Sequence, residues 1–284
     1  MDIKKVGVLG AGTMGAGIAQ VCAEAGYETV VVDIEEAILT KALASITKAW
    51  QKAVDKGKID DATKASREKL VTSSKEIASF KDCDLVIEAI AEQINIKQTV
   101  FKEMDAVCPS HAILATNTSA LSITEIAAAT SRADRIAGMH FFNPVSAMKL
   151  VEVVPGTSTS DATTETIVAF TKSIKKEPVI AKETPGFIVN RILNSLIIEA
   201  AFAYQEGVAS AEEIDKAMKL GANMPMGPLA LADLVGLDIA LHVSEYFYNE
   251  FGDSKYRPPI VLKQKVRAGH LGVKTGKGFY DYSK

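Results

Sequence analysis

The chain has 284 residues, which is long enough for two domains with buried cores. Hydrophobic residues make up 48% and charged residues 24%, as in ordinary globular proteins, and a formal net charge of -3 argues against nucleic-acid and membrane surfaces as partners. No apolar run approaches the roughly 20 residues that span a bilayer, and the N-terminus lacks a signal-peptide pattern, so we expect a cytoplasmic protein.

Short apolar runs alternate with helical patterns through the first half of the chain. The predicted strands are Val6–Leu9, Thr29–Val32, Asp84–Glu88, Ile113–Thr116, Arg135–His140 and Leu150–Val154. The predicted helices between them include Gly15–Ala25, Glu35–Gly57 and Lys97–Val107. This alternation is typical of an α/β fold with a Rossmann-like, doubly wound, mostly parallel sheet.

The last two predicted strands are joined by a short segment, residues 143–148, that contains Pro144. A parallel pair needs a crossover of about a dozen residues or more, usually a helix. We therefore expect these two strands to form an antiparallel pair at one edge of the sheet.

The pattern becomes purely helical after Pro185 and Gly186. Apolar residues then recur on one helical face, at Ile188, Ile192, Leu193, Leu196, Ile197 and Ala200. Further helices are predicted at Ala211–Lys219, Pro228–Leu234 and Ile239–Phe251. We expect an α/β domain at residues 1–185 and an all-helical C-terminal domain at 186–284.

A glycine-rich segment follows the first strand directly and opens a helix. It reads Gly10, Ala11, Gly12, Thr13, Met14, Gly15. In a dinucleotide-binding turn, the first glycine permits a tight turn, the second lets backbone approach a pyrophosphate, and the third allows the helix to pack closely on the strand. The free N–H groups at the helix N-terminus then bind the phosphates.

Asp33 ends the second strand, 23 residues beyond Gly10. An acidic residue at this distance accepts hydrogen bonds from the adenosine ribose, and its charge repels a 2′-phosphate. The pattern therefore favours NAD over NADP. The alternative is that Asp33 only caps the following helix.

His140 ends a predicted strand, and Glu152 lies twelve residues later in an otherwise apolar strand. Antiparallel pairing brings the two side chains together, and a buried carboxylate needs a partner. Alcohol oxidation requires a base for the hydroxyl proton, and an imidazole held by a carboxylate suits this role. The alternatives are a structural histidine and a salt bridge from Glu152 to Lys149.

Two polar residues complete the predicted site. Ser119 follows a strand of the parallel sheet, where ligands bind, so its hydroxyl is placed to contact a substrate oxygen. The alternative for Ser119 is a helix N-cap. Asn190 opens the helical domain and is placed to donate to a carbonyl or thioester oxygen, although backbone contacts alone are the alternative.

The cysteines and histidines suggest neither a disulfide framework nor a metal site. Cys22, Cys83 and Cys108 form no C-x-x-C pair, which favours buried, inert thiols in a reducing compartment. The four histidines lack the i, i+4 spacing of a helical zinc site. We therefore expect no metal.

At this point the chain resembles the short-chain 3-hydroxyacyl-CoA dehydrogenase family, in particular its bacterial 3-hydroxybutyryl-CoA branch. The resemblance runs in order over nearly the whole chain. The matching segments are Gly10–Gly15, Asn117–Ser119, His140–Pro144, Lys149–Val153, Pro185–Arg191, Met224–Pro228 and Lys274–Tyr280.

The resemblance implies a His140–Glu152 catalytic dyad, with Ser119 and Asn190 contacting the substrate. The cofactor-binding residues that it implies, beside the glycine-rich segment and Asp33, are Glu92, Lys97, Asn117, Ser119, Asn143 and Lys274. It also implies reversible oxidation of (S)-3-hydroxybutyryl-CoA by NAD⁺ in fatty-acid or butyrate metabolism.

The family further implies a homodimer through the helical domain and an acyl-CoA lying between the two domains. Lys52 and Lys56 are four residues apart on one helix and are predicted to meet CoA phosphates; a solvated basic face is the alternative. Two other functions fit the same fold. One is a dehydrogenase of a free hydroxy acid or sugar acid, and the other is a non-enzymatic NAD-binding structural protein.

Overall fold

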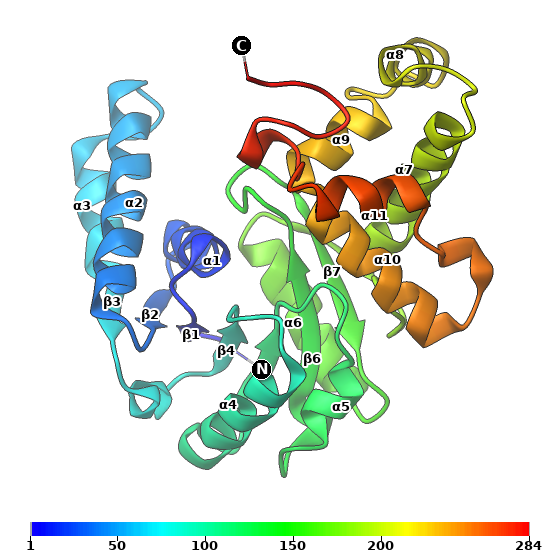
Figure 1. Ribbon diagram of the computed structural model, residues 1–284. Helices are drawn as coiled ribbons and strands as arrows, with labels where there is room; N and C mark the ends of the chain where they lie inside the picture. Colours follow the sequence, from blue (N-terminus) through cyan, green and yellow to red (C-terminus); the bar gives the residue numbers. More distant parts are fainter. Residues whose placement is uncertain (1, 284) are drawn as a thin grey trace. The chain divides into compact units, whose positions relative to one another are not determined.

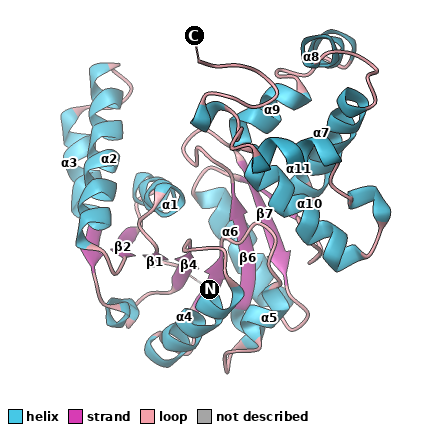
Figure 2. Ribbon diagram, in the orientation of Figure 1, coloured by secondary structure: helices cyan, strands magenta, loops and turns pink. Residues whose placement is uncertain are grey.

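The computed structural model describes residues 2–283 and divides the chain into two compact units, one ending at Phe187 and the next beginning at Ile188. This division lies close to the boundary at residues 185 and 186 that was predicted from the sequence. The strands all belong to the first unit, and the second unit is built from helices (Figure 2).

The first unit is built on an eight-stranded sheet with the order β3-β2-β1-β4-β5-β6-β7-β8 (Figure 1). The strands are β1 Lys5–Leu9, β2 Glu28–Val32, β3 Val71–Ser74, β4 Leu85–Glu88, β5 Ile113–Thr116, β6 Ile136–Phe141, β7 Leu150–Pro155 and β8 Glu177–Ile180. β7 runs antiparallel to β6, and every other neighbouring pair is parallel. The predicted doubly wound, mostly parallel sheet and its antiparallel pair are confirmed.

Helices cover both faces of this sheet, because alternate residues of each strand point to opposite sides. They are α1 Thr13–Glu24, α2 Glu36–Asp55, α3 Asp61–Leu70, α4 Ile94–Val107, α5 Ile123–Ala127 and α6 Asp161–Ser173, with short 3-10 turns η1 Ile77–Phe80 and η2 Ala133–Arg135. Val8 packs in one core with Ile18 of α1 and Trp50 of α2. Leu9, the next residue, packs in the other core with Phe101 of α4.

Several elements of the first unit were not predicted, among them β3, α3 and β8. β3 and β8 are the edge strands, and both are short and largely exposed; β3 is also mostly polar. α3 has no buried residue, so its sequence lacks the apolar stripe by which amphipathic helices are recognised. The helix predicted to run to Gly57 ends at Asp55, just before α3 begins.

The second unit is all-helical, as predicted. Its helices are α7 Val189–Gln205, α8 Ala211–Gly221, α9 Pro228–Val235, α10 Leu237–Phe251 and α11 Ile260–Arg267, with 3-10 turns η3 Ser254–Tyr256 and η4 Val273–Thr275. Asp215 accepts the N–H groups of Leu229 and Ala230 at 2.8 Å, in the first turn of α9. Asp233 is fully buried and accepts the N–H groups of Phe279 and Tyr280 at 2.9 Å, which fixes the C-terminal segment to α9.

All three cysteines are buried and free. Burial raises the pKa of the Cys22 and Cys83 thiols to about 12 and that of Cys108 to about 11. Since only a thiolate is a good nucleophile, these thiols are inert at neutral pH, in line with the expectation from the sequence.

Candidate active site

The glycine-rich segment forms the turn from β1 into α1. Gly10 has φ of 99°, and a Cβ on it would lie 2.6 Å from the Ala89 carbonyl oxygen. A Cβ on Gly15 would lie 1.7 Å from the carbonyl oxygen of Gly10, so only glycine fits either position. Gly12, by contrast, has open space where its Cβ would be, and no side chain caps the start of α1. This turn therefore fits a pyrophosphate, which would approach at Gly12 and bind the N–H groups of α1.

Asp33 lies immediately after β2 and faces the same turn. Its carboxylate accepts the N–H of Ala11 at 2.8 Å and that of Glu35 at 3.1 Å. The N-cap residue of α2 is Glu35, so the alternative that Asp33 caps this helix is wrong. Asp33 is half-buried, and its position beside the glycine turn suits an acceptor for the ribose hydroxyls of a dinucleotide.

A groove with a volume of about 520 Å³ opens beside this turn. Its lining comes from the turn itself, from α1 and α2, and from the connection between β6 and β7: Ala11, Gly12, Thr13, Ala16, Gly17, Gln20, Ile38, Lys41, Ala42, Ser45, Asn143, Pro144, Val145 and Ser146. Asn143, a predicted cofactor-binding residue, thus lines the same groove as the glycine-rich segment. Neither predicted CoA contact, Lys52 or Lys56, is part of this lining.

Lys41 and Ser45 of α2 line the groove but were not among the predicted site residues. With Lys48 and Lys52 they are spaced four, three and four residues apart, which places them along one face of the helix. All of these side chains are exposed, as is Lys56 at the C-cap of α2. This helical spacing is visible in the sequence, and it could have been used to add Lys41 and Ser45 to the predicted basic face.

His140 and Glu152 lie directly opposite each other on β6 and β7. The imidazole Nδ1 is 2.7 Å from Glu152 Oε2, and the two residues are 4% and 0% exposed. The predicted contact is therefore present, and Glu152 contacts His140 rather than forming the alternative salt bridge to Lys149. The rings of Phe142 and Phe187 pack on the imidazole at centroid distances of 4.5 and 5.6 Å. The imidazole of His140 is thus held at one ring nitrogen by Glu152 and packed by two aromatic rings.

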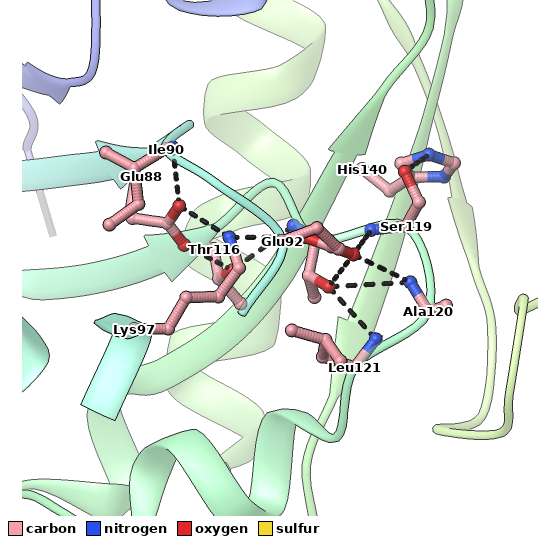
Figure 3. A network of polar contacts seen from close by, with 10 residues as sticks. Glu88, Ile90, Glu92, Lys97, Thr116, Ser119, Ala120, Leu121 and His140 are labelled. Carbon is pink, nitrogen blue, oxygen red and sulfur yellow. Dashed lines mark hydrogen bonds and ion pairs between the residues drawn. The ribbon is translucent and has the colours of Figure 1, made fainter. Parts of the chain in front are cut away.

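The other ring nitrogen of His140 meets Ser119. Ser119 Oγ is 3.2 Å from Nε2; Ser119 lies in the loop after β5, and His140 lies near the end of β6 (Figure 3). The alternative that Ser119 is a helix N-cap is wrong, because Ser122 caps α5 by accepting the Glu125 N–H. Asn117 supports the same region: its side-chain oxygen accepts the N–H of Phe141 at 2.8 Å.

The loop that carries Ser119 is held by Glu92. This carboxylate accepts the Thr118 hydroxyl at 2.5 Å, the Ser119 N–H at 2.8 Å and the Ala120 N–H at 3.3 Å (Figure 3). Lys97 reaches Glu92 at 3.3 Å, so the two predicted cofactor residues form an ion pair next to Ser119. Glu92 is 40% exposed and Lys97 is 1% exposed, which leaves the carboxylate open to a ligand.

Glu88, at the end of β4, was not among the predicted site residues. It is fully buried and accepts hydrogen bonds from Lys97 Nζ at 2.6 Å, Thr116 Oγ1 at 2.7 Å and the Ile90 N–H at 2.7 Å. These hydrogen bonds compensate the free-energy cost of burying the Glu88 charge, and they hold the Lys97 ammonium next to Glu92. The sequence signal for Glu88 was a single glutamate in an otherwise apolar strand, the same kind of signal that marked Glu152.

Two predicted site residues belong to the second unit. Asn190 is the second residue of α7 and is half-buried. Lys274 lies in η4, and its ammonium contacts the Asp238 carboxylate at 2.6 and 2.8 Å. Their roles stay predictions.

Within residues 2–283, every helix is too short or too polar to span a membrane. No group of three or more His, Cys, Asp or Glu side chains there is arranged to hold a metal ion.

Comparison with known proteins identifies the family. The profile of the 3-hydroxyacyl-CoA dehydrogenase NAD binding domain matches residues 5–184, and that of the C-terminal domain matches residues 186–282. The 3-hydroxybutyryl-CoA dehydrogenase of Clostridioides difficile is 52% identical over 280 residues, which cover 99% of this chain and 100% of that protein. A probable 3-hydroxybutyryl-CoA dehydrogenase of Bacillus subtilis is 46% identical over 284 residues, covering 100% and 99%.

A solved structure agrees with these relatives. The crystal structure of (S)-3-hydroxybutyryl-CoA dehydrogenase from Ralstonia eutropha is 48% identical, covers 100% of both chains and superposes with a TM-score of 0.98. The matching profiles span nearly the whole chain, and its two units have the architecture of that enzyme. The chain belongs to the 3-hydroxyacyl-CoA dehydrogenase family and is an NAD-dependent oxidoreductase acting on a CH–OH group.

Proposed function

We propose that this enzyme interconverts (S)-3-hydroxybutyryl-CoA and acetoacetyl-CoA. The observation that carries the proposal is the buried His140–Glu152 pair, with Nδ1 and Oε2 2.7 Å apart and the other imidazole nitrogen facing Ser119. The full-length similarity to 3-hydroxybutyryl-CoA dehydrogenases supports the choice of substrate.

In the oxidative direction, His140 Nε2 takes the proton of the 3-hydroxyl group. NAD⁺, when bound, supplies the acceptor for the hydride that leaves carbon 3. The alcohol thus loses a proton and a hydride and becomes a ketone. Glu152 accepts the Nδ1–H, which keeps the Nε2 lone pair toward the substrate and stabilises the imidazolium that forms. Ser119 Oγ, at 3.2 Å from Nε2, donates to the same substrate oxygen.

The cofactor residues divide by the part of NAD that they would hold. The glycine-rich segment Gly10–Gly15 binds the pyrophosphate, and the Asp33 carboxylate accepts hydrogen bonds from the hydroxyl groups of the adenosine ribose. Glu92, Lys97, Asn143 and Lys274 hold the nicotinamide half, with Asn117 fixing the strand end beside it. The support for this division is the open space at Gly12 and the shared groove of Asn143 and the glycine turn.

The CoA phosphates meet the basic face of α2. Lys52 and Lys56 are exposed on this helix, and Lys41 and Ser45 continue the same face into the groove. Each ammonium is a suitable partner for phosphate oxygens. Asn190, at the start of α7, contacts the substrate oxygen as a second polar group.

A steady-state assay tests the proposed reaction. We expect acetoacetyl-CoA to oxidise NADH rapidly and NADPH far more slowly, because Asp33 repels a 2′-phosphate. Turnover of free acetoacetate at a similar rate would instead support the hydroxy-acid alternative. Nucleotide binding without turnover of any 3-ketoacyl-CoA would support the structural-protein alternative.

The second unit carries the proposed dimer interface. Large apolar side chains are exposed on its helices, among them Ile192 at 65%, Leu220 at 78% and Ile260 at 64%. Contacts between two copies would remove such side chains from water. We expect sedimentation equilibrium to give twice the mass of one chain at micromolar concentration. A single-chain mass throughout that range would exclude a stable homodimer.

A further inference from the structure

Lys176 is a buried lysine to which the proposed function gives no role. It lies between α6 and β8 and is only 6% exposed. Its ammonium donates to the carbonyl oxygen of Val145, in a short contact, and to that of Met148 at 2.7 Å. Burial lowers the pKa of Lys176, against the opposing effect of the Glu24 carboxylate. A buried ammonium is costly without hydrogen bonds, so these two carbonyl groups are what make the position tolerable.

The backbone before Lys176 is specialised for this placement. Lys175 has φ of 59°, in the left-handed region that residues with a Cβ rarely adopt. The Lys176 N–H then closes the end of α6 by bonding to the Thr171 carbonyl at 3.1 Å. This turn directs the Lys176 side chain to the connection between β6 and β7.

Val145 supplies a second, independent anchor for that connection. It is 3% exposed, whereas the other residues from 143 to 148 are exposed. A Cβ on Gly17 of α1 would lie 2.8 Å from Val145 Cβ, so the absence of a side chain at Gly17 makes room for Val145. The connection is therefore fixed on α1 by the Val145 side chain and on Lys176 by the Val145 carbonyl.

The anchored connection forms one wall of the groove beside the glycine turn. Asn143, Pro144 and Ser146 line the groove next to Val145. We propose that Lys176 is a positioning residue, whose bonds to the Val145 and Met148 carbonyl groups hold Asn143 where it contacts the nicotinamide dinucleotide. This inference rests on the proposed role of Asn143 in cofactor binding.

The first test is the affinity of Lys176→Met for NADH, measured by fluorescence titration. Methionine keeps much of the side-chain length but cannot donate to the carbonyl groups. The loss of one well-placed hydrogen-bonding group lowers affinity by about 10- to 100-fold, so we expect the Kd for NADH to rise by about that factor. Lys172→Met, which changes an exposed lysine of α6, should leave the Kd unchanged. Circular dichroism at the titration temperature establishes that both variants are folded; if Lys176→Met is not, Lys176→Leu, which also cannot donate a hydrogen bond, replaces it.

The second test separates this inference from the proposed role of Asn143. Asn143→Ala alone should weaken NADH binding, and the double variant should bind no worse than Asn143→Ala, because Lys176 acts through Asn143. A wild-type Kd for Lys176→Met beside a raised Kd for Asn143→Ala would overturn the inference and leave the cofactor role of Asn143 intact. Additive losses would also overturn it. A wild-type Kd for Asn143→Ala would refute the cofactor role itself and the inference with it.

Discussion

Replacing His140 with alanine is expected to lower kcat by about 10²- to 10⁴-fold, the usual contribution of a general base. The imidazole is buried and packs against two aromatic rings, and its Nε2 is the nitrogen not engaged by Glu152. Without it, neither Ser119 nor Glu152 can accept the hydroxyl proton at a suitable position. The Kd for NADH should change little, because the dinucleotide contacts are assigned to other residues. Steady-state rates with acetoacetyl-CoA and fluorescence titration of NADH measure the two effects separately.

The matched control for this variant is His111→Ala. His111 is exposed and lies just before β5, where it contacts Asp84, just before β4. Both residues are at the amino ends of the strands, away from the carboxyl ends that carry the candidate site. Its removal should leave kcat and NADH affinity at their wild-type values. If His140→Ala retained a kcat within a few-fold of wild type, the base would have to be another group, and the proposed mechanism would fail.

The His140–Glu152 contact could be predicted because its causes are local in the sequence. Apolar strands flank a connection too short for a crossover, so antiparallel pairing follows, and the facing positions of the two strands are then nearly fixed. Glu152 is the one charged residue among apolar neighbours in its strand, which marks it as buried and paired. The glycine turn was predictable for the same reason, since strand, glycines and helix follow one another directly.

The supporting contacts could not be predicted in this way. Glu88 and Lys97 pair across the end of one strand and the first turn of the next helix, and Lys176 reaches a connection 28 residues earlier. The hydrophobic pattern of a sequence does not predict which buried charged residues form pairs, because the pairing depends on how the strands and helices pack. The short, exposed edge strands β3 and β8 were not predicted for a related reason: their position at the edges of the sheet, rather than an alternating apolar pattern, makes them strands.

Replacing Glu152 with glutamine is expected to lower kcat by about 10²- to 10⁴-fold while keeping the shape of the side chain. The carboxylate can only accept a hydrogen bond, so it fixes the proton on Nδ1 of His140 and leaves Nε2 free to act as the base. A glutamine amide can donate instead, which permits the tautomer with its proton on Nε2. It also lacks the charge that stabilises the imidazolium, so the rate should fall even where the imidazole keeps its place.

A double variant decides whether Glu152 acts through the imidazole. If it does, His140→Ala with Glu152→Gln should be no slower than His140→Ala alone, because the carboxylate then has nothing left to orient. Glu177→Gln is the control: this glutamate opens β8 next to Leu150 of β7 but is exposed to solvent, and its kcat should match wild type. A folded Glu152→Gln enzyme with wild-type kcat would remove the carboxylate from catalysis and reduce it to a buried partner that keeps β6 and β7 in register.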